Sequence, residues 1–112
     1  MTKRRIVGEL EQLVLMAVFR LREEAFGMAV WREIESRAGA SFPVGSVYMA
    51  LDRLQEKGYL RSKSGEVETG RGVEERLKFK ITGVGQSALA EALRRSDAMR
   101  RGLPGLKGVP AR

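Results

Sequence analysis

The sequence has 112 residues, of which 43% are hydrophobic and 31% charged, a composition typical of one water-soluble domain. It contains no cysteine and no histidine, which excludes disulfides, thiol nucleophiles, the usual zinc ligands and the commonest general base. The formal net charge is +7, which favours a polyanionic partner such as nucleic acid.

The positive charge is concentrated at the two ends of the chain. Residues 1–7 and 94–112 hold nine of the 21 basic residues and only one of the 14 acids. Residues 8–93 carry 12 basic and 13 acidic residues and are therefore close to neutral. Net charge alone thus supports affinity for polyanions in general, and sequence-specific DNA reading must be argued from the pattern of helices and strands.

No apolar run approaches the roughly 20 residues that are needed to cross a bilayer. The basic start is not followed by the apolar stretch and small-residue cleavage site of a secretory signal. We therefore expect a cytoplasmic protein with no membrane partner, no metal site and no cofactor.

The first helix is predicted over residues 8–23. Its apolar residues recur at helical spacing along one face; they are Leu10, Leu13, Val14, Ala17, Val18 and Leu21. Leu15 and Phe19 lie close to the opposite face, which a surface helix with a single core would leave polar. Two interpretations stay open, a wide core contact or a second protein surface. We favour the second, with a symmetric partner.

A second helix is predicted over residues 26–38, and Gly39 ends it. Trp31 lies beside the apolar stripe of this helix and is expected to be a core or interface anchor, with ligand stacking as the alternative. The connection at residues 39–43 is short, so the second and third helices must pack at a steep angle. This is the geometry of a helix-turn-helix.

The third helix, predicted over residues 44–57, is the most informative segment. Val47, Leu51 and Leu54 recur at i, i+4 and i+7, which places them on one buried stripe. Side chains on the other faces are within reach of a partner; they are Tyr48, Met49, Asp52, Arg53 and Glu56. Pro43 suits the first turn of this helix, because its missing N–H costs nothing there.

Two strands are predicted at residues 59–67 and 75–81, with Gly65, Gly70 and Gly72 in the loop between them. The second strand alternates apolar with basic residues, as a half-buried strand does; the apolar ones are Leu77, Phe79 and Ile81. Thr82 is a good N-cap for a last helix over residues 83–101. Residues 102–112 hold three glycines and two prolines and are expected to be a disordered tail.

This order of elements predicts an α+β fold, mainly α, that is a winged helix-turn-helix followed by a C-terminal helix. The predicted parts are a basic arm (residues 1–7), a DNA-binding domain (8–81), the C-terminal helix (82–101) and the tail (102–112). No catalytic residues are nominated. The glycine-rich loop lacks the Gly-Lys-Ser/Thr of a P-loop, and the adjacent acids at 23–24 and 74–75 do not converge on one site.

Motifs at characteristic spacings cover about residues 8–95. They are Gly8-Glu9-Leu10-Glu11, Leu13-Val14-Leu15, Phe26-Gly27, Gly45-Ser46-Val47-Tyr48, Ala50-Leu51, Arg53-Leu54, Lys57-Gly58-Tyr59-Leu60, Gly70-Arg71-Gly72 and Ile81-Thr82 with Gly85. In this order they resemble the PadR-type transcriptional regulators, in the short form with a single C-terminal dimerisation helix. The resemblance implies a homodimer held by the first and last helices. It also implies repression from a pseudo-palindromic operator in double-stranded DNA, often relieved by a small molecule.

Site residues are expected in three groups. The DNA-binding candidates are Ser46, Tyr48, Met49, Arg53, Lys57, Lys63, Arg71 and Arg76. The dimer-interface candidates are Leu15, Phe19, Leu89, Leu93 and Met99. A pocket for a small hydrophobic effector is expected near Phe19, Trp31, Leu93 and Met99, with a filled dimer core as the alternative.

Two of the DNA-binding candidates have structural alternatives. Tyr48 is either a DNA contact or a half-buried packing residue, and Arg53 either meets DNA or pairs with Asp52 or Glu56. The chain also departs from the family at two positions. Pro43 stands where a Ser or Thr cap is common, and Val73-Glu74-Glu75 occupies a wing tip that is usually basic. Acids facing phosphates would be repulsive.

Three functions are consistent with the sequence. A dimeric, sequence-specific DNA-binding repressor is favoured. A winged helix that serves as a protein-interaction module is the second, supported by the acidic wing and by Asp52 and Glu56 on the exposed helix face. A general nucleic-acid binder acting through its basic ends is the third.

Overall fold

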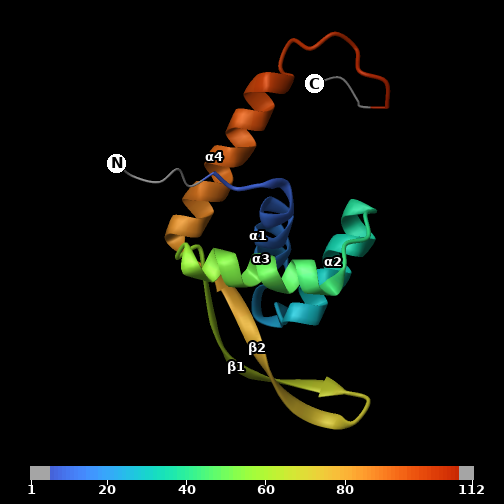
Figure 1. Cartoon of the computed structure of the whole chain (residues 1–112), viewed down its shortest axis with the longest axis vertical. Coiled ribbons are helices and arrows are strands. Elements are labelled where there is room, and N and C mark those ends of the chain that lie inside the picture. The colour runs from blue at the N-terminus through green and yellow to red at the C-terminus, as the bar shows by residue number, and fades with distance from the viewer. Residues whose placement is uncertain (1–5, 109–112) are drawn as a thin grey trace.

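The computed structural model describes residues 6–108 of the chain. The elements follow in the order α1 (Glu9–Leu21), a short 3-10 turn (Arg22–Glu24), α2 (Gly27–Ala38), α3 (Val44–Glu56), β1 (Leu60–Thr69), β2 (Gly72–Ile81) and α4 (Gly83–Arg100). Figure 1 shows α1, α2 and α3 grouped at the centre, with the hairpin projecting below them and α4 rising away on the other side. The predicted α+β, mainly helical, winged fold is confirmed.

The core forms where the apolar stripes of α1, α2 and α3 meet the base of the hairpin. The predicted stripe of α3 is confirmed, because Val47, Leu51 and Leu54 are fully buried. Leu15 of α1 is also fully buried, and the prediction that it lies on an outward face is wrong. The reason is that α1 has neighbours on several sides, since α2, α3, β2 and α4 all contact it. The wide core contact is therefore the correct interpretation for Leu15, whereas Phe19 stays 45% exposed.

The hairpin is longer than the sequence indicated. β1 and β2 pair antiparallel from Leu60 opposite Ile81 to Thr69 opposite Gly72, so only residues 70 and 71 form the turn. Gly65 lies inside β1 rather than in the loop, and a Cβ there would stand 3.3 Å from the Phe26 ring. The outer half of the hairpin reaches beyond the helices (Figure 1). The helices cover the hairpin only near its base (Figure 1), so Leu77, predicted on the buried side, is already 53% exposed four residues before the end of β2.

α4 is joined to the body at its first turn. The Thr82 hydroxyl accepts a hydrogen bond from the backbone N–H of Gly85 at 3.0 Å and donates one to the carbonyl oxygen of Gly58 at 2.7 Å. This confirms the predicted N-cap. Leu89 and Ala92 are buried against the core, whereas the distal part of α4 extends away from the body (Figure 1).

The chain ends differ from their predicted parts in one respect. Val7, assigned to the basic arm, is 3% exposed and belongs to the core. The arm residues Lys3, Arg4 and Arg5, and residues 109–112 of the predicted tail, lie outside the described residues. Residues 102–108 are exposed and contain no helix or strand. In the part of the chain that the structure describes, no helix has the length and apolar character needed to cross a bilayer.

Candidate nucleic-acid interface

Trp31 fixes the connection between α2 and α3. Gly39 ends α2 in the left-handed conformation, with φ +68°. The indole Nε1–H of Trp31 donates a hydrogen bond of 2.7 Å to the carbonyl oxygen of Phe42. Phe42 directly precedes Pro43, which is the N-cap of α3 rather than a first-turn residue. Trp31 thus ties the start of α3 to the middle of α2 and helps to set the angle between the two helices.

α3 has one buried side and one free side. Figure 1 shows it lying across the front of the helical core. Its free side carries the side chains predicted to face a partner; they are Tyr48, Met49, Asp52, Arg53 and Glu56. Met49 is 61% exposed, and Ser46 in the first turn is half-buried. A helix held in this way, with its outer face open, has the form of a groove-reading helix.

Tyr48 has both a packing role and an exposed surface. Its ring covers Gly27 at the start of α2, where an added Cβ would stand only 2.5 Å from the Tyr48 hydroxyl oxygen. The side chain is nevertheless 38% exposed. The packing alternative raised from the sequence therefore holds in part, and Gly27 is the residue that makes room for the ring.

Glu11 of α1 is the residue that the sequence interpretation missed. It is 7% exposed, and its carboxylate meets Arg53 Nε at 3.2 Å and Lys57 Nζ at 3.0 Å. It also accepts a hydrogen bond from the backbone N–H of Gly8 at 3.1 Å. Arg53 thus pairs with Glu11, 42 residues away, and not with the acids of its own helix. One signal was present in the sequence, because Glu11 precedes Val14 by one helical turn on the buried side of α1.

These contacts change the acidity of Glu11. Burial by itself would raise the pKa of its carboxyl group, but the hydrogen bonds from Lys57, from the Gly8 backbone and from Arg53 together outweigh burial and hold the pKa below its ordinary value. Glu11 is therefore ionised at neutral pH and fixes both cations of α3 against α1. The ion pair orients Arg53, whose side chain remains 48% exposed.

One of the two adjacent wing-tip acids, Glu74, is compensated within the hairpin. The Glu74 carboxylate is bonded to Arg76, to Thr69 Oγ1 at 3.1 Å and to Arg71 Nε at 3.1 Å. The hydrogen bond from Arg76 is the main reason that the pKa of Glu74 lies below its ordinary value. Glu74 is thus compensated within the hairpin, while the Arg71 side chain, although paired with Glu74, stays 82% exposed at the turn.

Lys63 does not lie with the other DNA-binding candidates. The strand register pairs Arg61 with Lys80 and Lys63 with Lys78, which gathers four cations at the base of the hairpin. They line a pocket whose walls come from α1, the 3-10 turn, the hairpin and α4, and no α3 residue described in the structure lines it. Pairing the two strands around residues 70 and 71 would have revealed this cluster from the sequence. Across residues 6–108 no group of three or more acidic, His or Cys side chains could hold a metal ion.

An apolar groove of about 570 Å³ lies between α1, α2 and α4. Phe19 and Leu93 line it and are 45% and 39% exposed. Leu89 also lines it but is only 7% exposed, because most of its surface packs in the core of its own chain and little of it is left for a partner. Trp31 and Met99 do not line this groove, and the four residues predicted to form an effector pocket are therefore not brought together. A hydrophobic effector stays a prediction.

Comparisons with solved structures agree with this architecture. A PadR family transcription regulator from Clostridium difficile R20291 has a TM-score of 0.66 at 18% identity, covering 84% of this chain and 93% of its own. A PadR-like transcription factor from Bacteroides fragilis has a TM-score of 0.62 at 25% identity, covering 80% and 82%. RosR of H. salinarum has a TM-score of 0.64 at 20% identity, covering 91% and 84%.

Comparison of the sequence with protein-family models identifies the family of the chain. No curated protein matches the sequence closely enough to count as a relative. The family model of the transcriptional regulator PadR-like family matches residues 14–91, which run from within α1 through α2, α3 and the hairpin to the middle of α4. This match covers more than half of the 112 residues. The chain therefore belongs to the PadR-like family of transcriptional regulators.

Proposed function

We propose that this protein is a cytoplasmic, homodimeric repressor that binds a pseudo-palindromic operator in double-stranded DNA. The observation that carries the proposal is the outer face of α3. Trp31 ties the start of this helix to α2, and Glu11 ties its last turn to α1. Between these two fixed ends, Tyr48, Met49 and Arg53 face outward. A rigid helix with a free polar face is what base reading in the major groove requires.

The hairpin supports the same proposal. Arg71 lies at its turn with an exposed side chain, and Arg76 is 45% exposed. Both pair with Glu74, and a phosphate would compete for these guanidinium groups. In this arrangement α3 supplies the base contacts, and the wing tip supplies backbone contacts that position the domain.

The experiment that tests this function is a selection of binding sites from random duplex DNA, followed by titration of the selected duplex and a scrambled one. The proposal predicts that the selection converges on a two-fold symmetric site. It also predicts that this site binds at least about 1,000-fold more tightly than the scrambled duplex at physiological salt. A pool that does not converge, or equal affinity for both duplexes, contradicts sequence-specific reading.

At the level of single residues, Tyr48→Ala and Arg53→Ala should each weaken binding to the selected duplex by about 1–3 kcal/mol, because each removes a side chain from the reading face. Lys107→Ala is the matched control. It removes one exposed charge beyond the end of α4 and should change the affinity little. Thermal unfolding shows whether each variant keeps its fold. If both α3 variants fold normally and bind like the Lys107 variant, α3 is not the reading element.

Homodimerisation rests on surfaces that one chain leaves uncovered. The groove between α1, α2 and α4 is mostly apolar in its lining residues, with Phe19 and Leu93 at its edge. The distal part of α4 extends away from its own body (Figure 1), and Met99 there is 78% exposed. A two-fold axis would lay the distal α4 of each chain along the groove of the other and cover both surfaces together.

Leu93→Asp should convert the dimer to a monomer at micromolar concentration, because it buries an unpaired charge in the interface. Val84→Asp is the control. Val84 is 63% exposed on the same helix and does not line the groove, so this variant should remain a dimer. Multi-angle light scattering measures both masses. A wild-type monomer at this concentration, or identical masses for the two variants, would refute the proposed interface.

A protein-interaction module is the second candidate, and one observation favours it. The cations of α3 are partly compensated by Glu11, while Asp52 and Glu56 stand exposed on the same helix. The outer face therefore has little excess positive charge. The binding-site selection separates the two candidates, since a protein-interaction module would select no DNA sequence.

A further inference from the structure

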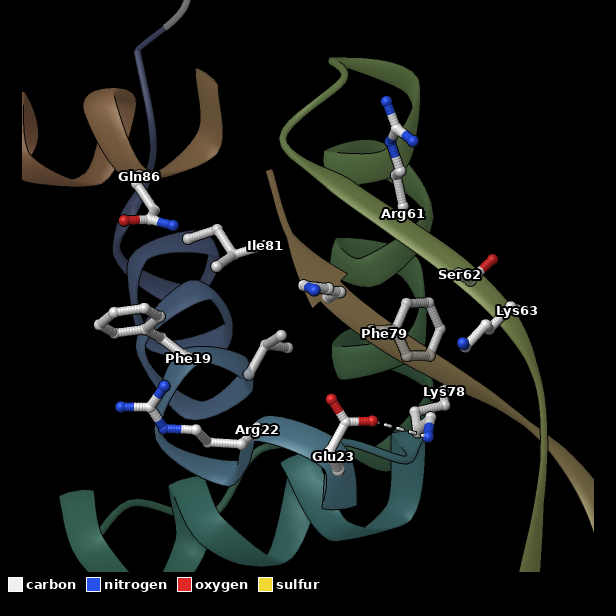
Figure 2. A pocket seen from close by; sticks show the side chains of 12 residues that line it. Phe19, Arg22, Glu23, Arg61, Ser62, Lys63, Lys78, Phe79, Ile81 and Gln86 are labelled. Carbon is white, nitrogen blue, oxygen red and sulfur yellow. Dashed lines mark hydrogen bonds and ion pairs between the residues drawn. The ribbon is translucent and has the colours of Figure 1, made fainter. Parts of the chain in front are cut away.

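The pocket at the base of the hairpin, called here the cationic pocket, has a volume of about 510 Å³. It is lined by Val18, Phe19, Arg22, Glu23, Arg61, Ser62, Lys63, Lys78, Phe79, Lys80, Ile81 and Gln86. Figure 2 shows Phe19, Arg22 and Glu23 on one side, and Arg61, Ser62 and Lys63 on the other. Its size lies within the range of pockets that hold small organic ligands.

The charge of the cationic pocket is strongly one-sided. Its lining includes five cations, which are Arg22, Arg61, Lys63, Lys78 and Lys80, and a single acid, Glu23. Glu23 pairs with Lys78, whose Nζ lies 3.0 Å from the carboxylate (Figure 2). The hydrogen bond from Lys78, together with the charges of Lys78, Lys80 and Lys63, holds the pKa of Glu23 below its ordinary value. Cations other than its own partner therefore also act on this acid.

The strand register makes this clustering unfavourable in the absence of an anion. Lys63 stands directly opposite Lys78, and Arg61 stands directly opposite Lys80. Like charges that face each other across two strands destabilise a sheet. A bound anion with more than one negative charge would attract both pairs and offset the repulsion within each of them.

The backbone at Arg22 is a second unusual feature of the same pocket. Arg22 has φ 54° and ψ −119°, and it is the single non-glycine residue with a positive φ in the described part of the chain. A conformation of this kind is strained for any residue with a side chain. Here it places the guanidinium over the ring of Phe19, 5.6 Å from the ring centre. A cation and an aromatic ring therefore share one wall.

The remaining surfaces of the pocket are apolar. Val18, Phe79 and Ile81 line it from the core, each with less than a tenth of its surface exposed. These side chains have no polar groups that could bind a bare inorganic ion, but they can pack against an apolar or aromatic part of a ligand. The cavity therefore combines an apolar wall, which includes Phe19, with a cluster of cations from the hairpin.

We propose that the cationic pocket binds an organic phosphate that carries a flat ring, of the mononucleotide class. The ring lies against Phe19 and the Arg22 guanidinium, and the doubly charged phosphate lies between the cations of β1 and β2. A monocarboxylate would neutralise only one of the excess charges. Duplex DNA is the less suitable occupant, because the cavity has an apolar interior and no α3 residue described in the structure lines it. The site is independent of the proposed operator binding, whereas Phe19 lines both this pocket and the groove of the proposed dimer and would lie between the ligand and the partner's α4.

The test is a calorimetric titration of the full-length protein at about 0.15 M salt, where weak attraction between exposed charges is largely screened. Adenosine monophosphate is the probe, and adenosine and inorganic phosphate are the two comparison ligands. We expect saturable binding of one adenosine monophosphate per chain, and at least tenfold weaker binding of adenosine and of phosphate. Equal binding of adenosine overturns the role of the cations, and equal binding of phosphate overturns the role of the ring.

Variants show whether the binding occurs in this pocket. The double variant Lys63→Gln/Lys80→Gln should lower the affinity for adenosine monophosphate at least tenfold. Arg71→Gln removes a cation of the same hairpin outside the pocket and should leave the affinity unchanged. Arg22→Gly removes the guanidinium while relieving the backbone strain, so it should keep or raise the thermal stability and yet weaken binding.

Three results would overturn the proposal. The first is the absence of saturable binding. The second is equal affinity of the double variant and the wild-type protein for adenosine monophosphate. The third is a loss of affinity for random duplex DNA in the double variant while adenosine monophosphate does not bind, which would assign these cations to a DNA-backbone surface.

Discussion

Gly85→Ala should lower the free energy of unfolding by about 3 kcal/mol, the upper part of the range for overpacked sites. A Cβ at this position would collide with the carbonyl oxygen of Tyr59 and stand 3.0 Å from Ile81 Cγ1. The same Tyr59 oxygen accepts a hydrogen bond from the Thr82 N–H at 3.0 Å. Backbone cannot move aside as a flexible side chain can, so α4 would have to shift away from the hairpin.

Gly83→Ala is the matched control for this prediction. It lies in the same first turn of α4, and a Cβ there would meet no atom within 4 Å. We expect its stability to rise by about 0.5 kcal/mol, because alanine restricts the unfolded chain more than glycine does. Urea unfolding of the three proteins measures both differences. Similar stabilities for the two variants would show that α4 does not approach Tyr59 as closely as the structure has it.

Glu11→Gln should destabilise the fold by about 2 kcal/mol at pH 7, because it replaces charge-assisted hydrogen bonds at a buried position by weaker ones. Arg53 and Lys57 would lose the anion that holds them against α1. Both cationic groups would still be partly hydrated, which limits the loss of stability. The Glu9→Gln variant changes an exposed carboxylate two residues away and should differ little from the wild-type protein.

The effect of Glu11 should depend on pH in a defined direction. Its pKa in the folded protein lies below the ordinary value of 4.5, so the folded state favours the ionised form. The stabilisation is therefore fully present above about pH 4.5 and is lost as the pH falls through the lowered pKa of the folded state. Unfolding measured from pH 7 downward should show the wild-type and Glu11→Gln curves converging in acid. A constant difference between them down to the lowest pH would mean that the carboxylate charge is not what stabilises the fold.

The local pattern of the sequence was enough to predict the order of elements. Spacing of apolar residues placed α1, α2 and α3, alternation placed β2, and Thr82 marked the start of α4. The same reasoning failed for Leu15, because it assumed one buried face for a helix that has neighbours on several sides. It also shortened the hairpin at its outer end, because Gly70 and Gly72 were taken as signs of a longer loop, whereas the strands pair as far as Thr69 opposite Gly72.

The candidate site was predictable only in part, for a related reason. Which side chains of α3 face outward follows from helical spacing, and Tyr48, Met49 and Arg53 do so. What holds them does not follow from spacing, because the partner of Arg53 is Glu11, on another helix. The bond from Trp31 to the Phe42 carbonyl likewise depends on how α2 and α3 pack.

The most direct test of a dimer that reads DNA with two copies of α3 is hydroxyl-radical footprinting on the selected duplex. Such a dimer should give two protected patches related by two-fold symmetry, with their centres about 34–36 Å apart, which is one turn of DNA. Leu93→Asp, expected to be monomeric, should lose this paired footprint at the same protein concentration. A single protected half-site with the wild-type protein, or uniform protection along the duplex, would contradict a dimer that reads DNA with two copies of α3.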